Sequence, residues 1–436
     1  MNPTALREVS NLSTGSGDVK QRLAQRRSAN LESCRYPYSS SAVRHGSGSL
    51  LSLRSSLYSP VGTAGKESSV SPHADRLREN NPVYCSDVIK DITTMYMESE
   101  KEAIYGQVLP SPRYLTYQPE INEKMRMILV DWLIDVHLKF KLHPETLYLT
   151  VSIVDRYLSS VNTRRTTGRY IPRSKLQLVG ITAILLAAKY EEIWPPEVKE
   201  CVYICANTYT RDEVIRMERE MCTELSFRFT VPTPFPFIVR LLDVVEGLER
   251  QQQTQQLSHQ LQQIQSQSQS QSQQTQMQAS QSQPQSLSRS RSQSRSQPRS
   301  DEECTAYVLQ LRHTAFFFLD HGMLDYKCLQ FSPSQQAKAA LFLALVTLHM
   351  KEQGSSYVLN NDIIWTRQLQ YYSKAQVRDF KACARTMLDF VSYVSTTRYQ
   401  SVRRKYSSSK YGEVAKLTMP SKYLTFDWFT SLHSAV

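Results

Sequence analysis

Between residues 121 and 229 the apolar residues recur at three- and four-residue spacing, which is the repeat of an amphipathic helix. The clearest stripe consists of Met125, Ile128, Leu129, Trp132, Leu133 and Val136. This stretch shows no alternation of apolar and polar residues of the kind that predicts strands. The pattern predicts five helices, near residues 122–140, 145–159, 173–190, 196–205 and 211–225.

A second helical pattern begins near Pro234, is interrupted, and then runs from Cys304 to about Thr397. The interruption, at about 248–303, is dominated by Gln and Ser and ends in Arg-Ser dipeptides. Such a tract cannot bury enough apolar surface to offset its ordering entropy, so we expect a disordered insert. Residues 1–80 are rich in Ser, Arg and Gly, and we expect them to form a disordered regulatory tail.

These patterns predict an all-α chain with two helical domains. The first is expected at 81–232 and the second at 233–415, followed by a C-terminal tail at 416–436. No apolar run reaches the roughly 18 residues that a membrane helix needs, so we expect no membrane contact. The eight cysteines form no CxxC pair, which argues against a structural metal and for a reducing compartment.

The formal net charge of +12 raises the question of a nucleic-acid partner. Residues 1–80 hold 11 basic and 6 acidic groups, and residues 251–300 hold four arginines and no acid. Nine of the twelve net charges therefore lie in low-complexity sequence. The helical domains are only weakly basic, which argues against a dedicated phosphate-binding surface and against nucleic acid as the partner.

Four short segments follow one another in the first domain. They are residues 125–133 (MRMILVDWL), 175–180 (KLQLVG), 185–198 (LLAAKYEEIWPPEV) and 216–218 (RME). In this order and spacing they resemble the cyclin box, and the chain resembles a mitotic, B-type cyclin. Two further segments carry the resemblance. Residues 331–340 (FSPSQQAKAA) resemble the start of the central helix of the second cyclin fold, and residues 403–411 (RRKYSSSKY) resemble the segment that closes B-type cyclins.

The resemblance implies two tandem five-helix cyclin folds. It implies a non-enzymatic regulatory subunit that binds and activates a cyclin-dependent protein kinase and docks its substrates, at the G2/M stage of the cell cycle. It also implies that the chain uses no cofactor and acts in the nucleus and cytoplasm. Independently of the resemblance, the sequence has no glycine-rich phosphate loop, no HRD or DFG triplet and no Gly-x-Ser-x-Gly elbow, so we predict no catalytic residue.

Lys189 and Glu218 match the lysine and glutamate with which cyclins grip their kinase. By the resemblance, Lys189 donates to backbone carbonyls beside the αC helix of the kinase, and Glu218 accepts from backbone N–H groups there. The residues expected on the same surface are Tyr190, Glu191, Glu192 and Ile193. Taken without the resemblance, Lys189 ends a nearly all-apolar helix, where a charge needs a partner or an exit to solvent, and a plain intramolecular Lys–Glu pair would suffice.

The resemblance also implies an exposed apolar groove that receives Arg-x-Leu peptides from substrates and inhibitors. Its expected lining is Met125, Ile128, Leu129, Trp132, Leu176 and Gln177. Asp135, at the acidic position of the groove, would attract the arginine of the peptide. The alternative is that these residues pack into the core. Asp131 is expected to tie helices together, with Arg126 as its buried ion-pair partner.

Arg54 and Leu57 fit the minimal Arg-x-x-Leu destruction box of mitotic cyclins, which would bring the ubiquitin ligase machinery to the tail. Gly62 stands where the longer motif prefers Asn. Two other functions stay open at this point. One is a transcription-associated cyclin. The other is a cyclin-fold nucleic-acid or transcription factor, although such factors normally add an amino-terminal zinc ribbon and this chain has no paired cysteines there.

Overall fold

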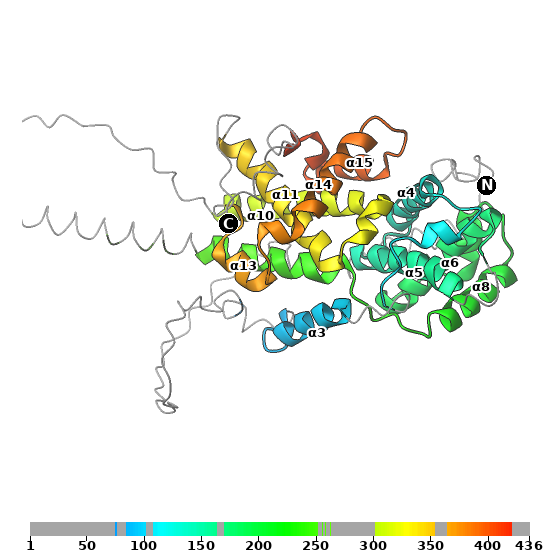
Figure 1. Ribbon diagram of the computed structural model, residues 1–436. Coiled ribbons are helices and arrows are strands. Elements are labelled where there is room, and N and C mark those ends of the chain that lie inside the picture. Colours follow the sequence, from blue (N-terminus) through cyan, green and yellow to red (C-terminus); the bar gives the residue numbers. More distant parts are fainter. Residues whose placement is uncertain are drawn as a thin grey trace, which may run out of the picture.

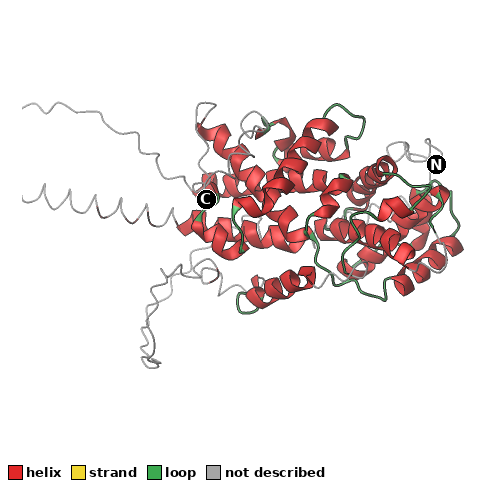
Figure 2. Cartoon of the chain, viewed as in Figure 1, coloured by secondary structure: helices red, strands yellow, loops and turns green. Residues whose placement is uncertain are grey.

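The computed structural model describes residues 84–101, 108–163, 170–251, 301–353 and 364–420, together with the single positions 75, 255, 258 and 262. Within these ranges every regular element is a helix, which confirms the all-α prediction (Figure 2). The predicted tail, apart from Asp75, lies outside the described residues, as do most of the predicted insert and the last sixteen positions.

The first domain contains the five predicted helices. They are α4 (Glu123–Phe140), α5 (Pro144–Thr163), α6 (Leu176–Glu191), α7 (Val198–Ile204) and α8 (Arg211–Glu224). Helix α6 is the centre of the domain, because all its residues from Leu176 to Ala188 are buried and it contacts α4, α5, α7 and α8. A helix that is apolar all round is stable only when other helices cover it on every side, and here the four neighbours do so.

Local side chains determine where these helices begin and end. Asn122 caps α4 by accepting from the backbone N–H of Met125 at 3.0 Å. Thr210 and Glu213 form a reciprocal capping box at the start of α8. Helix α4 ends at Phe140, and the next residue, Lys141, adopts the left-handed conformation with φ 55°.

The second domain repeats the plan around a different central helix. A helix at 234–251 is followed by the elements α10 (Asp301–Leu324), η4 (Tyr326–Gln330), α11 (Pro333–Gln353), α13 (Arg367–Ser373) and α14 (Val377–Val394). The closing elements are α15 (Ser401–Tyr406), η5 (Ser409–Tyr411) and η6 (Val414–Lys416). Helix α11 lies between α10 and α14, and its residues from Ala339 to Val346 are all buried. Figure 1 shows the two domains side by side. The hydrophobic core of the second domain also includes residues of α4 and α5, such as Met127 and Tyr148, whereas the rest of the first domain has a core of its own.

Two elements cross between the domains. Helix α3 (Ile89–Lys101) precedes the first domain in sequence, where we expected it to belong, yet Tyr96 and Met97 pack against the core of the second domain. Its Glu100 carboxylate accepts from the backbone N–H of Ser334 at the start of α11, at 2.5 Å. Helix α15 returns from the second domain and packs on α4.

Candidate functional site

Lys189 and Glu218 form an ion pair with each other in the structure, which is the arrangement that the sequence allows without any partner. Lys189 lies in the last turn of α6 and Glu218 in α8, and the ammonium nitrogen is 2.5 Å from the Glu218 Oε1. The Lys189 side chain is 47% exposed, because the last turn of this apolar helix reaches solvent. An ion pair this open contributes at most about 1 kcal/mol, and it can therefore be exchanged for other partners at little cost.

Large apolar side chains lie exposed in the segments that follow α6 and α8. Ile193 and Trp194, just after α6, are 73% and 62% exposed, and Phe227, just after α8, is 70% exposed. Tyr190 is also exposed. Its ring packs 6.1 Å from that of Phe229, and its hydroxyl shares a hydrogen bond with Thr230. We call Lys189, Tyr190, Ile193, Trp194, Glu218 and Phe227 the α6–α8 face. Trp194 and Phe227 were not predicted, because exposure of an aromatic residue in a loop leaves no periodic signal.

Glu192 is not part of this face, so its prediction as a surface residue is wrong. Its carboxylate is buried and accepts from the backbone N–H of His143 at 2.7 Å and from the Thr146 hydroxyl at 2.5 Å. It thus satisfies polar groups at the start of α5, which would otherwise be orphaned. Glu191, its neighbour, stays partly exposed, and burial followed by repulsion from Glu192 raises the pKa of Glu191.

The residues predicted to line an apolar groove are brought together by α4 and α6, but mostly within the core. Leu129 and Leu176 are fully buried, and Met125, Trp132 and Gln177 are nearly so. The expected open apolar patch is therefore absent among these five residues. Helix α6 can approach α4 this closely because position 180 is Gly, where a Cβ would come within 2.8 Å of the Leu129 Cδ1. Ile128 is only partly buried and packs toward the second domain.

Two polar atoms in this set are nevertheless unsatisfied. The Trp132 Nε1 and the Gln177 Nε2 are buried and have no hydrogen-bond acceptor in the structure. Buried donors almost always have an acceptor, and those that do not call for an explanation such as a ligand. These two donors belong to neighbouring helices and mark a place where acceptor oxygens would be stabilised.

The two aspartates of α4 both accept hydrogen bonds from α15. Asp131 accepts from the backbone N–H of Ser401 at 3.1 Å and from the Ser401 hydroxyl. Asp135 accepts from Arg404, whose Nη2 lies 2.8 Å from each carboxylate oxygen. Burial raises the pKa of both aspartates. Asp131 therefore does tie elements together, as predicted, but through Ser401.

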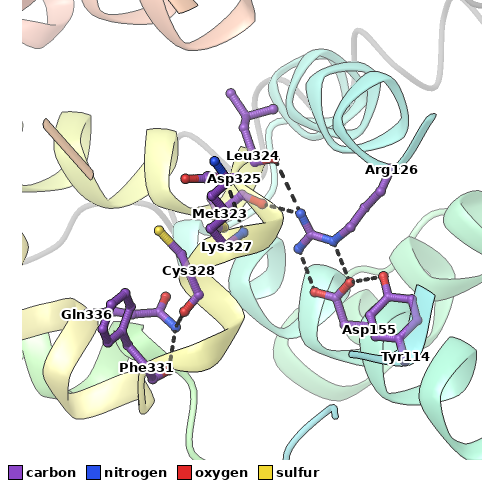
Figure 3. A network of polar contacts seen from close by, with 10 residues as sticks. All are labelled: Tyr114, Arg126, Asp155, Met323, Leu324, Asp325, Lys327, Cys328, Phe331 and Gln336. Atoms are coloured by element: carbon purple, nitrogen blue, oxygen red, sulfur yellow. Dashed lines mark hydrogen bonds and ion pairs between the residues drawn. The ribbon is translucent and has the colours of Figure 1, made fainter. Parts of the chain in front are cut away.

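The predicted Arg126–Asp131 pair is wrong, because the partner of Arg126 is Asp155 of α5 (Figure 3). The Nε and Nη2 of Arg126 each lie 2.7 Å from an Asp155 oxygen, and both side chains are almost completely buried. Residues five positions apart in an α-helix point roughly 140° away from each other, so Asp131 lies on another side of α4. Sequence spacing could not supply the correct partner, which is 29 residues away.

The Arg126–Asp155 pair also joins the two domains. The Nη1 of Arg126 donates to the carbonyl of Met323 at 2.9 Å, and the Tyr114 hydroxyl donates to Asp155 at 2.8 Å. Burial opposes the charge on Arg126, but attraction and hydrogen bonds from Asp155 outweigh it, so the pKa of Arg126 is raised. A buried guanidinium with all these partners fixes the end of α10 relative to α4 and α5.

Several predictions fall beyond the described residues. Arg54 and Leu57 lie outside them, and so does the Arg-Ser part of the insert. In the part of the chain that the structure describes, no helix is long and apolar enough to cross a membrane. The same part contains no cluster of three His, Cys, Asp or Glu side chains placed to hold a metal ion.

Comparison with known proteins identifies both domains. Residues 91–230 match the family described as "Cyclin, N-terminal domain", and residues 288–420 match "Cyclin, C-terminal domain". The chain is 35% identical to the G2/mitotic-specific cyclin S13-7 of Glycine max over 315 residues. The aligned region covers 72% of this chain and 90% of the relative. It is 32% identical over 350 residues to Cyclin-B2-1 of Oryza sativa subsp. japonica, covering 80% of this chain and 63% of that one.

A third relative and one solved structure complete the comparison. The G2/mitotic-specific cyclin-2 of Antirrhinum majus is 32% identical over 376 residues, covering 85% of this chain and 65% of that one. The chain thus spans slightly less than two thirds of the rice and Antirrhinum relatives. The X-ray structure of a viral cyclin from herpesvirus saimiri matches with a TM-score of 0.44 and 17% identity, over 72% of this chain and 99% of that chain.

Proposed function

We propose that this chain, which belongs to the cyclin family, binds a cyclin-dependent protein kinase through the α6–α8 face and activates it. The observation that supports this most strongly is the solvent-accessible Lys189–Glu218 pair together with the exposed side chains of Tyr190, Ile193, Trp194 and Phe227 at the ends of the same two helices. Contiguous exposed apolar side chains with a polar rim are typical of a protein interface, and aromatic residues contribute most to binding energy in such interfaces.

The two charged side chains of the α6–α8 face, Lys189 and Glu218, are able to bind backbone groups of a partner helix. Lys189 offers three donors and Glu218 four acceptor positions, and their mutual ion pair is weak because it is exposed to water. A partner helix with free carbonyl and N–H groups can take over both side chains in charge-assisted hydrogen bonds. Binding there would shift the αC helix of the kinase, close its Lys–Glu ion pair and open its activation loop, while this chain contributes no chemical step.

We further propose that the protein acts at G2/M and docks substrates beside α4. The timing is supported by the similarity to G2/mitotic-specific cyclins of plants. Docking is supported by the two unsatisfied donors, Trp132 Nε1 and Gln177 Nε2, which could donate hydrogen bonds to the carbonyl oxygens of an extended peptide. Because Leu129 and Leu176 are fully buried, such a peptide would have to open the groove slightly to insert an apolar side chain.

The test is the double variant Lys189→Ala/Glu218→Ala, studied as purified protein with a cyclin-dependent kinase. We expect a loss of kinase affinity of at least about 30-fold, because the partner helix loses charge-assisted hydrogen bonds at the centre of the interface. The matched control is Lys416→Ala/Glu413→Ala, which removes another exposed ion pair (2.8 Å) in the second domain.

Calorimetric affinity and kinase turnover should fall together in the first variant and stay at the wild-type level in the control. Melting temperatures of both variants should lie close to that of the wild type. A Lys189→Ala/Glu218→Ala protein that binds and activates the kinase at wild-type concentration would show that the α6–α8 face is not the interface.

A further inference from the structure

A cavity of about 440 Å³ lies between the two domains. Its walls come from the end of α4 and the start of α5 on one side, and from α10, α15 and η5 on the other. The volume is within the range of about 300–1,000 Å³ that is typical of ligand sites. Leu309 of α10 lines the cavity and is 49% exposed, so part of the wall is in contact with water.

Most of the cavity wall is apolar or aromatic. The side chains of this kind include Leu142, Leu147, Phe235, Leu309, Phe316 and Tyr411. The rings of Phe235 and Phe316 pack 5.8 Å apart and form one continuous aromatic surface. An occupant of the cavity therefore needs large apolar side chains, preferably aromatic ones.

The charged side chains of the cavity are mainly basic. Four cationic side chains line it, namely Lys141, Arg312, Lys405 and Lys410. Asp320 is the one acid among the described lining residues, and it is already paired with Lys405 at 2.7 Å. Burial, followed by repulsion from three of these cations, lowers the pKa of His313 to about 4. An acidic group in the occupant would be attracted by this excess of positive charge.

His137 adds a third requirement, which is a hydrogen-bond donor. Its Nε2 lies 2.9 Å from the carbonyl oxygen of His143, which can only accept, so Nε2 carries the proton and Nδ1 is an acceptor. Burial, followed by repulsion from Lys405, lowers the pKa of His137 to about 4, so the ring is neutral at pH 7. His137 is 4% exposed and lines the cavity, yet its Nδ1 has no hydrogen-bond partner in the structure. A buried acceptor of this kind calls for an N–H or O–H group.

We propose that residues 421–436 of this chain dock in the cavity, with aromatic side chains against its walls and Asp427 beside its basic side chains. The segment meets all three requirements. It supplies Phe426, Trp428 and Phe429 as apolar groups, Asp427 as its acid, and the indole N–H of Trp428 as a donor. The docked segment joins the two domains, because the walls belong to both, and this role is independent of kinase binding.

The path of the chain brings the segment close to the cavity. Tyr411 lines the cavity, and the chain then follows α10 through η6 to Leu417 and Met419, which pack on the core of the second domain. Trp428 is eight positions beyond Pro420, and an extended chain of that length spans about 26–29 Å. So short a tether gives the segment an effective concentration of about 1 mM at the cavity.

The experiment is a peptide-binding cycle with the full chain. Fluorescence anisotropy measures how a labelled peptide with the sequence of residues 421–432 binds to the wild type and to Trp428→Ala/Phe429→Ala, whose own segment has lost its anchors. If the peptide binds this variant with a dissociation constant of about 0.1 mM, it should bind the wild type about tenfold more weakly, because the tethered segment competes. A peptide carrying Asp427→Lys should bind the variant about threefold to tenfold more weakly at low salt.

A further substitution locates the bound peptide. Leu309→Glu, added to Trp428→Ala/Phe429→Ala, places a negative charge on the apolar wall and should weaken peptide binding by at least about tenfold. Tyr371→Glu in the same background is the matched control, because Tyr371 of α13 is 47% exposed and does not line the cavity. Both positions are exposed, so the melting temperatures should stay close to that of the parent variant.

Four results would overturn the inference. The absence of binding to Trp428→Ala/Phe429→Ala would mean that the cavity does not accept the segment. Equal binding to this variant and to the wild type would mean that the segment does not occupy the cavity in the intact chain. Binding that Leu309→Glu leaves unchanged would place the peptide elsewhere. A wild type that sediments as a dimer, beside a monomeric Trp428→Ala/Phe429→Ala, would mean that the segment docks on a second copy.

Discussion

The surroundings of a single residue determine its pKa and its contribution to stability, as two glutamates show. Glu192 and Glu145 are both acids near the start of α5, but Glu192 has two donors and Glu145 has a like charge nearby. Burial, followed by repulsion from Glu191, raises the pKa of Glu145 to about 7. A carboxyl group in that position costs stability whenever it is ionised.

This cost should appear as a pH-dependent effect of Glu145→Gln. Between pH 4.5 and about 7 the unfolded chain loses the proton of Glu145 while the folded chain keeps it, so the free energy of unfolding falls as pH rises. Above pH 7 the full penalty is present, and the variant should be more stable than the wild type by about 1–2 kcal/mol, a value reduced for partial exposure.

Urea unfolding at pH 4 and pH 8 measures this difference. At pH 4, below both pKa values, wild type and Glu145→Gln should have nearly equal stability. Glu123→Gln is the control, because Glu123 is an exposed acid in the first turn of α4. If Glu145→Gln gave the same change at both pH values, Glu145 would be an ordinary ionised side chain.

At the scale of elements, the helices of the first domain could be predicted closely because their apolar stripes and caps are local signals. All five were found near their predicted positions. The site could be predicted only where a motif carries it. The sequence offered an ion pair between Lys189 and Glu218 as the alternative to kinase contacts, and that pair is present. The inward turn of Glu192 and the pairing of Arg126 with Asp155 depend instead on contacts between distant residues. No periodicity encodes which direction a charged side chain takes.

The docking of α3 on the second domain is a case of such a distant contact. Ser332 and Gln335 already cap α11 reciprocally, and the N–H of Ser334 is left for Glu100. We expect Glu100→Ala to lower the free energy of unfolding by about 1 kcal/mol and to speed hydrogen exchange in residues 89–101, because the bond that holds the end of α3 is lost.

Hydrogen-exchange mass spectrometry of α3 checks this expectation. Glu98→Ala is the matched control, since Glu98 is an exposed acid two positions away on the same helix. Glu100→Gln, which keeps an acceptor but loses the charge, should lie between wild type and Glu100→Ala. Equal exchange in Glu100→Ala and Glu98→Ala would mean that Tyr96 and Met97 alone hold α3.

At the scale of the whole molecule, the insert separates two helices that lie against each other. Residues on both sides of it, Glu246 and Arg250 before and Cys304 and Val308 after, line one small cavity of about 60 Å³. Farther along, Arg312 of α10 lies 3.4 Å from Asp243. The two helices therefore contact each other close to where the chain enters and leaves the insert, and a short connection can join them.

We accordingly expect that replacing residues 252–300 with six Gly and Ser residues preserves the fold and kinase activation. The tract offers almost no apolar surface to a core, and shortening a connection of about 50 residues to six lowers its closure cost by about 2 kcal/mol. The melting temperature should therefore stay constant or rise by a few degrees, and kinase turnover should not change. A melting temperature lower by more than about 5 °C would instead mean that residues of the insert pack on the helices around Glu246 and Cys304 and contribute to their stability.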